Sequence, residues 1–258
     1  MDLGIQGRRA IVLGSSRGLG LACATALATE GVHVVLNGRD TDTLEKARAR
    51  LEETGASVEA VRGDIADQAT RDALLRTCPE PDILITNAGG PPPGRLRDAT
   101  PEHWAHGLQV NLFAHLDLIE RVIDGMRERR FGRIVNITSA MVTTPRPTMA
   151  VSSGVRSALT AVVKGLSLDV VRDNVTINNL LPERFDTARQ EHMANVAAHR
   201  DGITYDEARH HQTASIAAGR LGRPEELGAT CAFICSVWTG YMSGQNIHLD
   251  GGSYPALV

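Results

Sequence analysis

Residues 9–20 read RAIVLGSSRGLG, and this stretch decides the fold. Its first five residues form a short apolar run, and Gly14, Gly18 and Gly20 follow just before an alanine-rich helix predicted over residues 18–29. Glycine lets the backbone turn tightly and approach a ligand closely, and a helix N-terminus presents free N–H groups to a pyrophosphate. The spacing G-x-x-x-G-x-G differs from the commoner G-x-G-x-x-G. Its place after a first strand still predicts a dinucleotide site.

The rest of the chain alternates predicted strands and helices. The strands are expected at residues 9–13, 32–36, 57–62, 82–86, 133–137, 176–181 and 245–249. This alternation predicts a doubly wound, Rossmann-like α/β fold, with a parallel sheet of about seven strands and helices on both faces. No linker or change of composition divides residues 1–258, so we expect one domain. Its mobile part should be the polar helical segment 186–219, where Thr204 and Glu207 are spaced as a capping box. Asp42 and Glu45 predict another capping box, and Pro224 the start of a late helix.

Composition and charge narrow the class of protein. The 258 residues are 42% hydrophobic and carry a net charge of −3, which gives no basic excess for nucleic acid or a membrane surface. We interpret the local basic cluster Arg127, Arg129, Arg130 and Arg133 as a solvated helix end. The N-terminus has no signal-peptide pattern and no apolar run reaches about 18 residues, so we expect a cytoplasmic protein without a membrane span. No metal site is expected, because the four cysteines show no ligand spacing and suit buried positions: Cys23, Cys78, Cys231 and Cys235.

The end of the second strand indicates which dinucleotide is bound. An NAD site usually carries an acid there for the ribose hydroxyl, but the sequence has Asn37, Gly38, Arg39 and Asp40. Gly38 stands where the acid is expected, and Arg39 and Arg17 offer guanidinium groups for a 2′-phosphate. Asp40, one position later, weakens the argument without reversing it. We therefore expect NADP(H) as the preferred cofactor, with NAD(H) possible.

Motifs along the whole chain together resemble the short-chain dehydrogenase/reductase family, and most closely its beta-ketoacyl-acyl-carrier-protein reductase branch. They are Gly14, Gly18 and Gly20, the turn 87–89 (NAG), Asn111, Ser139 and the late 250–252 (DGG). The resemblance implies that Asn111 holds a proton-relay water and that Ser139 binds the substrate carbonyl oxygen. It also places Asp64 and Ile65 beside the adenine ring and Thr187 at the nicotinamide carboxamide. With the residues discussed above, the expected cofactor-binding set is Gly14, Ser16, Arg17, Gly18, Leu19, Gly20, Asn37, Arg39, Asp64, Ile65, Asn87, Ala88, Gly89, Arg156 and Thr187.

The sequence departs from this family at the catalytic Tyr-x-x-x-Lys motif. Ser152 occupies the tyrosine position and Arg156 the lysine position, and Glu183 replaces the glycine of the family's Pro-Gly. A phenol near a cation is a useful general acid, whereas a serine hydroxyl is shorter and much less acidic. Arg156 keeps a positive charge beside the nicotinamide ribose. The cofactor side of the site is thus expected to be intact and the acid–base side altered.

Three alternatives follow from this departure. The first is an NADP-dependent reductase of a carbonyl substrate, 3-oxoacyl-like, small or carried on an acyl carrier. It would use Asn111, Ser139, Ser152 and Arg156, and a water as the proton source. The second is a catalytically silent NADP-binding sensor or partner subunit. In the third, a residue of the mobile segment supplies the acid, the candidates being His192, Tyr205 and His210.

The substrate pocket is expected beyond the carboxyl ends of the strands. Its predicted walls are the loop around residues 91–93 (PPP), residues 141–149 and the segment 186–219. The family resemblance also implies a homotetramer that packs through the long helices carrying Asn111 and Ser152 and through the last strand.

Overall fold

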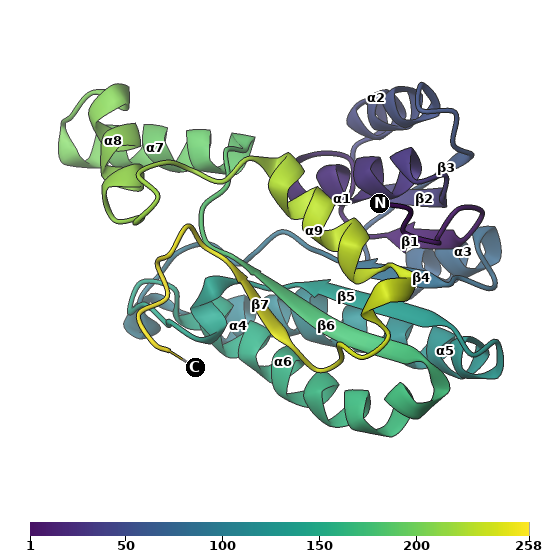
Figure 1. Ribbon diagram of the computed structural model, residues 1–258. Coiled ribbons are helices and arrows are strands. Elements are labelled where there is room, and N and C mark those ends of the chain that lie inside the picture. The colour runs from purple at the N-terminus through teal and green to yellow at the C-terminus, as the bar shows by residue number, and fades with distance from the viewer. Residues whose placement is uncertain (258) are drawn as a thin grey trace.

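The computed structural model describes residues 1–257 and contains one parallel sheet of seven strands (Figure 1). The strand order is β3-β2-β1-β4-β5-β6-β7, and every neighbouring pair is parallel. The chain direction across the sheet reverses between β1 and β4, which is where open α/β sheets bind ligands. The predicted fold class is therefore confirmed. The strands are β1 (Arg9–Val12), β2 (His33–Gly38), β3 (Val58–Arg62), β4 (Ile83–Thr86), β5 (Gly132–Ile137), β6 (Val175–Pro182) and β7 (Asn246–Leu249).

Helices cover both faces of the sheet, and each face has its own apolar core. One core holds α1 (Gly18–Thr29), α2 (Thr41–Glu52) and α9 (Pro224–Ile234). A Cβ on Gly228 of α9 would lie 2.5 Å from the carbonyl oxygen of Ala22, so α1 and α9 pack backbone against backbone. The other core holds α3 (Gln68–Thr77), α5 (Ala114–Glu128) and α6 (Ala150–Val170).

A π-helical turn at Gln109–Phe113 joins α4 (Pro101–Leu108) to α5. Thr100 caps α4 by accepting a hydrogen bond from the His103 N–H, and Pro101 occupies its first turn. The π turn carries Asn111, which is 2% exposed, and it packs against α6. Such turns are frequent at functional sites. The spacing of apolar residues does not reveal the π turn that carries Asn111.

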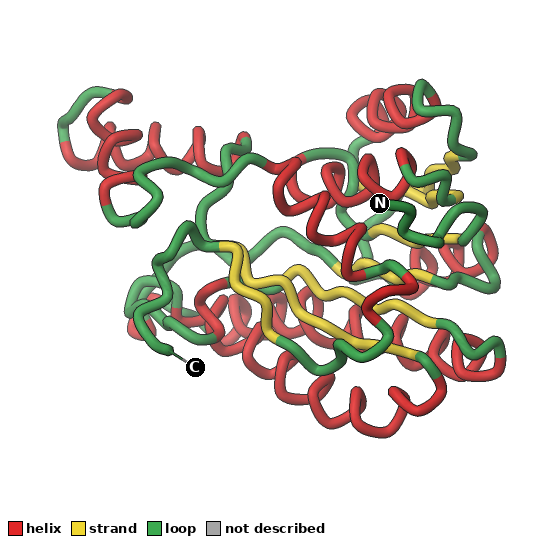
Figure 2. The backbone as a smooth tube through the Cα atoms, in the orientation of Figure 1, coloured by secondary structure: helices red, strands yellow, loops and turns green. Residues whose placement is uncertain are grey.

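The helices α7 (Ala188–Asp201) and α8 (Tyr205–Ala214) form a hairpin that extends away from the sheet (Figures 1 and 2). Ala194 and Ala208 are the only residues of these two helices that are buried. The hairpin occupies the segment expected to be helical and polar, and Thr204 and Glu207 form the predicted capping box. Pro224 also begins α9 as predicted.

Two local interpretations of the sequence are wrong. Helix α2 is capped by Asp40, whose carboxylate accepts a hydrogen bond of 2.9 Å from the Thr43 N–H, and not by an Asp42–Glu45 capping box. Arg133 is not part of a solvated helix end, because it lies in β5 and its side chain is 1% exposed. Its guanidinium donates to the carbonyls of Ser236 and Asn174 and lies over the Phe131 ring, and these long-range partners make its burial possible.

All four cysteines are buried free thiols, as predicted. No helix among residues 1–257 combines the length and the apolar character needed to cross a membrane.

His115 makes a testable link between burial and pH. The side chain is 1% exposed, and neither ring nitrogen has a hydrogen-bond partner among residues 1–257. Burial, with a smaller effect of Arg156, lowers the pKa of His115 to about 3. In the unfolded chain the His115 imidazole therefore binds a proton near pH 6.5, whereas in the folded chain it stays neutral until about pH 3. The free energy of unfolding thus decreases as the pH falls from about 6.5 toward 3.

We expect His115→Leu to gain stability relative to the wild type by about 1.4 kcal/mol for each pH unit below about 6. Chemical denaturation at pH 7, 6 and 5 measures this difference. His33→Leu is the matched control, because His33 is exposed and its replacement should leave the slope unchanged. Parallel pH profiles for the wild type and His115→Leu would contradict the burial of a neutral imidazole.

Candidate functional site

The glycine-rich turn after β1 is held in place by two asparagines. Gly14 has a φ of +56°, and its N–H donates to Oδ1 of Asn37 over 3.4 Å. The side-chain amide of Asn87 donates to the Gly14 carbonyl over 3.1 Å. A Cβ on Gly20 would lie 2.3 Å from that same carbonyl oxygen, so only glycine lets α1 begin so close to the turn. The structure thus brings together Gly14, Gly20, Asn37 and Asn87, as the sequence analysis expected.

The first turn of α1 is open to an anion. Arg17 precedes the helix without a side-chain cap, and the first turn contains no acidic residue. The N–H groups of this turn are therefore available to a ligand, and the helix dipole favours negative charge there. Thr187 completes the enclosure, because its methyl carbon lies 3.9 Å from the position that a Cβ on Gly18 would take. Ser16 and Leu19 are half-buried in the same turn. This cradle fits the diphosphate of a dinucleotide.

The end of β2 excludes an acidic side chain at the expected position. A Cβ on Gly38 would lie 2.9 Å from the Cβ of Ser16, so nothing larger than glycine fits there. Asp40 is engaged as the α2 cap, and the Thr43 hydrogen bonds lower the pKa of its carboxyl group. The Arg39 side chain is 72% exposed and lies 3.5 Å from the Asp64 carboxylate.

Asp64 and Ile65, expected beside the adenine ring, come just after the end of β3. The Asp64 carboxylate also accepts from the Ala66 N–H over 2.9 Å. Ile65 is buried beside it, and its carbonyl is held by the Arg71 guanidinium over 2.6 Å.

The positively charged Arg156 side chain lies inside the protein, against the backbone just before Ser139. Its Nη1 atom donates to the carbonyls of Ile137 over 3.0 Å and Thr138 over 2.9 Å, and its Nη2 atom donates to Ala88 over 3.5 Å. The side chain is 7% exposed, and burial lowers its pKa to about 10, so it stays charged at neutral pH. The guanidinium therefore joins α6 to the ends of β5 and to the loop after β4.

The two serines present hydroxyl groups with donor capacity. Ser139 Oγ accepts a hydrogen bond of 3.2 Å from the Met141 N–H, which leaves its own proton free to donate. Ser152 is 4% exposed and lies one helical turn before Arg156 on α6. Asn111 donates weakly to the Gly107 carbonyl over 3.4 Å, and its Oδ1 atom is buried without a partner in the same described part of the chain.

The predicted walls of the substrate pocket meet at two points. Gly94, just after the prolines, pairs with Met149 and exchanges backbone hydrogen bonds with Thr148 and Ala150. Arg189 of α7 donates to the carbonyls of Gly90 over 3.4 Å and Pro91 over 3.5 Å. The stiff proline loop is thus contacted by both of the other expected walls.

Several residues at the site were not predicted from the sequence. Arg189 reaches the loop after β4, and His115 lies buried near Arg156. Glu183 is 5% exposed and binds Arg146 over 2.6 Å and Arg184 over 3.2 Å. The available signals were an arginine two residues after Thr187, a histidine four residues after Asn111 and an acid in place of a family glycine.

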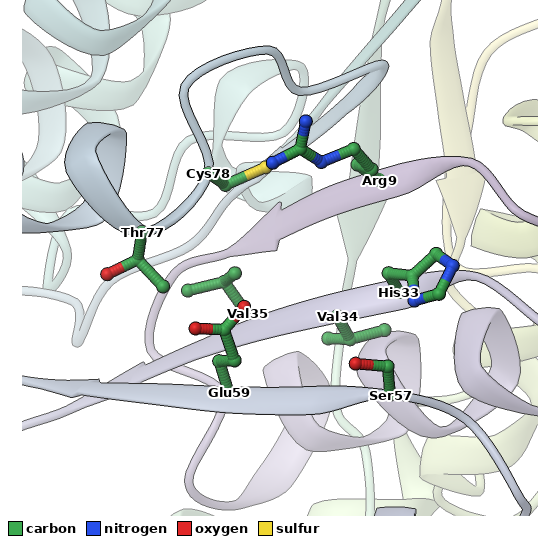
Figure 3. A pocket seen from close by; sticks show the side chains of 8 residues that line it. All are labelled: Arg9, His33, Val34, Val35, Ser57, Glu59, Thr77 and Cys78. Atoms are coloured by element: carbon green, nitrogen blue, oxygen red, sulfur yellow. The ribbon is translucent and has the colours of Figure 1, made fainter.

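The structure does not bring His192, Tyr205 or His210 to Ser139. All three are exposed on the α7–α8 hairpin, which extends away from the sheet (Figure 1). The hollow in Figure 3 also lies apart from the site. Arg9, His33 and Ser57 line it at the amino ends of β1, β2 and β3, whereas the glycine turn follows the carboxyl end of β1.

The arrangement can support a reaction at a carbonyl group. Two hydroxyl donors and a fixed positive charge stabilise negative charge that develops on an oxygen. None of the three tyrosines of the chain, Tyr205, Tyr241 and Tyr254, belongs to the segment 139–156. The segment 139–156 therefore supplies hydroxyl donors and a positive charge but no phenol.

Known proteins resemble the chain over nearly its whole length. Residues 14–254 match a family model described as Enoyl-(Acyl carrier protein) reductase. The NADPH-dependent reductase BacG of Bacillus subtilis (strain 168) is 30% identical over 97% of this chain and 99% of BacG. Gluconate 5-dehydrogenase of Gluconobacter oxydans (strain 621H) is 32% identical over 96% of this chain and 95% of that protein.

Solved structures show the same likeness in three dimensions. L-sorbose reductase from Gluconobacter frateurii, complexed with NADPH and L-sorbose, superposes with a TM-score of 0.94 and 30% identity, and the match covers 100% of both chains. YwfH, an NADPH-dependent reductase involved in bacilysin biosynthesis, gives a TM-score of 0.91 at 29% identity, covering 98% of this chain and 100% of YwfH. Together with the glycine turn, the two asparagines that hold it and the seven-stranded sheet, these matches show that the chain belongs to the short-chain dehydrogenase/reductase family.

Proposed function

We propose that the protein is an NADP-dependent oxidoreductase that transfers a hydride between the nicotinamide and a carbonyl or alcohol group of a 3-oxoacyl-like substrate. The substrate would be a small molecule or an acyl group on a carrier. The observation that carries this proposal is the buried Arg156 guanidinium, fixed between the loop after β4 and the backbone just before Ser139. Relatives named as NADPH-dependent reductases support the same cofactor and reaction class.

The residues divide the work between holding the cofactor and stabilising charge. The turn from Gly14 to Gly20 would bind the diphosphate, with Arg17 and Arg39 at the 2′-phosphate and Thr187 at the carboxamide end. Bound NADPH supplies the hydride, which adds to the carbonyl carbon as the C=O π electrons move to oxygen. The Ser139 and Ser152 hydroxyls donate hydrogen bonds to that oxygen, and the Arg156 charge stabilises it. A water then gives the oxygen its proton, completing the alcohol and leaving hydroxide to the solvent.

The absence of a phenol sets the expected rate. General acid–base catalysis contributes roughly 10²- to 10⁴-fold, so a site that relies on hydrogen bonds and charge should be slow but active. The missing tyrosine also favours a second candidate function, a catalytically silent NADP-binding sensor or partner subunit. Measurements of binding and turnover together separate the two.

The α7–α8 hairpin is proposed as a movable wall of a one-domain protein. Val196 and Tyr205 are 45% and 40% exposed, so the hairpin leaves apolar surface uncovered. Its base is fixed by Arg209, which binds Asp186 over 2.6 Å, and by the Arg189 contacts to the loop after β4. Substrate bound against these contacts would bring the hairpin toward the sheet.

A homotetramer is proposed from the family resemblance. Phe113, Val162 and Leu168 are 54%, 49% and 67% exposed on the π turn and on α6, where one subunit interface is expected. β7 is an edge strand of the sheet, and a cavity of about 460 Å³ lies beside it. A second subunit would cover both surfaces.

Cofactor preference is tested at the two arginines. We expect NADPH to bind more tightly than NADH, and Arg17→Ala and Arg39→Ala each to weaken NADPH about 10-fold or more, because each removes a charge-assisted contact to the phosphate. NADH affinity should change far less. Fluorescence titration measures both constants. Arg48→Ala is the control, since Arg48 pairs with Glu45 and Glu52 on α2. Equal wild-type affinities for the two cofactors would contradict the assignment.

Turnover is tested with NADPH and a panel of carbonyl compounds that includes 3-oxoacyl thioesters and polyhydroxy ketones. We expect slow, substrate-dependent loss of NADPH absorbance that Ser139→Ala reduces by about 10²-fold or more, because the mutation removes an oxyanion donor. Tight NADPH binding without oxidation by any compound would instead support the silent sensor.

The altered motif is tested by Ser152→Tyr combined with Arg156→Lys. We expect kcat to rise, within the roughly 10²- to 10⁴-fold range of general acid catalysis, because the pair restores a phenol beside a cation. The pH profile of kcat should also gain a basic limb that the wild type lacks. Arg156→Lys alone is the control, and no gain in the double variant would mean that the pocket, and not only the acid, has changed.

A further inference from the structure

Two guanidinium groups converge at Gly90 in the loop after β4. The Nη2 atoms of Arg156 and Arg189 lie 3.2 and 3.6 Å from the position that a Cβ on Gly90 would take. Arg156 comes from α6 inside the protein, and Arg189 comes from the first turn of the α7–α8 hairpin. Burial, and to a smaller extent the charge of Arg189, lowers the pKa of Arg156. The site thus concentrates two positive charges at one point of its wall.

No acidic side chain neutralises this pair. Within residues 1–257, neither Arg156 nor Arg189 forms an ion pair with Asp or Glu, and both bind only backbone carbonyls. The nearby Arg146 and Arg184 differ, because they share the carboxylate of Glu183. Arg156 is buried and Arg189 is exposed, so their like charges repel each other across a site that water partly screens. An anion placed between the guanidinium groups would remove that repulsion.

Arg189 is poised to exchange its present partners for an anion. Its hydrogen bonds to the Gly90 and Pro91 carbonyls are long, at 3.4 and 3.5 Å. Hydrogen bonds to an ionised acceptor are shorter and stronger than such contacts. Arg156 in contrast is held firmly by Ile137 and Thr138, so it offers a fixed charge toward which Arg189 can bring the hairpin.

The anion has two sources, and the positions of the charges distinguish them. The cofactor's diphosphate is already provided for by the uncapped α1 terminus, and its 2′-phosphate by Arg17 and Arg39. The nicotinamide ribose, which the resemblance places beside Arg156, is neutral, and so is the nicotinamide ring in NADPH. Arg156 of this pair binds the carbonyls of Ile137 and Thr138, just before Ser139, where the substrate is proposed to react. A negative group on the substrate is therefore the better partner for the pair.

We propose that Arg189, with Arg156, binds the carboxylate of the substrate, so that the enzyme acts on carbonyl compounds that carry an acid group. This inference rests on the proposed function and narrows its substrate class. The carboxylate holds α7 at the loop after β4 and places the carbonyl group of the same molecule at Ser139. Arg189 is thus a specificity-determining residue, and the acid group couples substrate binding to the position of the hairpin.

The test compares matched acids and esters. The probes are 4-oxopentanoate, 5-oxohexanoate and their methyl esters, together with the unreactive pair pentanoate and pentanamide. Binding to the protein saturated with NADP⁺ is measured by calorimetry, and turnover by NADPH absorbance. In the wild type we expect the acid to be preferred over its neutral partner by about 10- to 100-fold, the size of a charge-assisted hydrogen bond. The same ratio is measured at 50 and 500 mM salt and should shrink at the higher value.

Arg189→Gln should reduce the preference for the acid to near 1, and Arg189→Lys should restore part of it. Arg200→Gln is the matched control on α7, since Arg200 is exposed and pairs with its neighbour Asp201, and it should keep the wild-type ratio. Equal wild-type affinity for acid and neutral probe would overturn the proposal. So would an Arg189→Gln variant that keeps the acid preference but binds NADPH about 10-fold less tightly, because the anion would then be the cofactor diphosphate. Reduction of the methyl esters by the wild type would leave the proposed oxidoreductase function standing in either case.

Discussion

The guanidinium of Arg156 is a buried charge that is held by backbone carbonyls and by no carboxylate. The carbonyls belong to the end of β5 and to the loop after β4, so one side chain fixes α6 against two neighbouring strands. Removing a buried charge from water is costly unless its hydrogen bonds are satisfied, and here the partners are neutral. The positive field is therefore not cancelled inside the protein, and it extends into the site where Ser139 stands.

The two asparagines that hold the glycine turn show why the cofactor side of the site does not depend on the altered Ser152–Arg156 motif. Asn37 and Asn87 hold Gly14 from opposite sides, and Gly20 touches the same peptide. None of these contacts involves Ser152. The loss of a tyrosine at that position changes how an oxygen obtains a proton, but it leaves the shape of the diphosphate cradle unaffected. A protein of this design can bind a dinucleotide well and react slowly, which is the balance proposed for this chain.

The sequence was sufficient for features whose cause is local. Alternating apolar runs and glycine turns predicted the seven-stranded parallel sheet, and the spacing of Thr204 and Glu207 predicted a helix start. It failed where a nearby residue competed, as when Asp40 rather than Asp42 capped α2. It also failed where the partner is distant in the chain. The burial of Arg133 depends on Ser236, and the position of Arg189 depends on the loop after β4, so neither follows from local spacing.

The segment from Glu183 to Arg189 contacts three separate parts of the site. Glu183 ties the end of β6 to Arg146, while Thr187 closes over the glycine turn and Arg189 touches the loop after β4. The hairpin beyond it is mostly exposed, and Arg209 ties it back to this segment by binding Asp186. A change in charge at the Arg156–Arg189 pair therefore acts at the base of the α7–α8 hairpin. In the proposed binding mode an acid group on the substrate would neutralise this pair, so the charge that selects the substrate would also hold the base of the hairpin at the loop after β4.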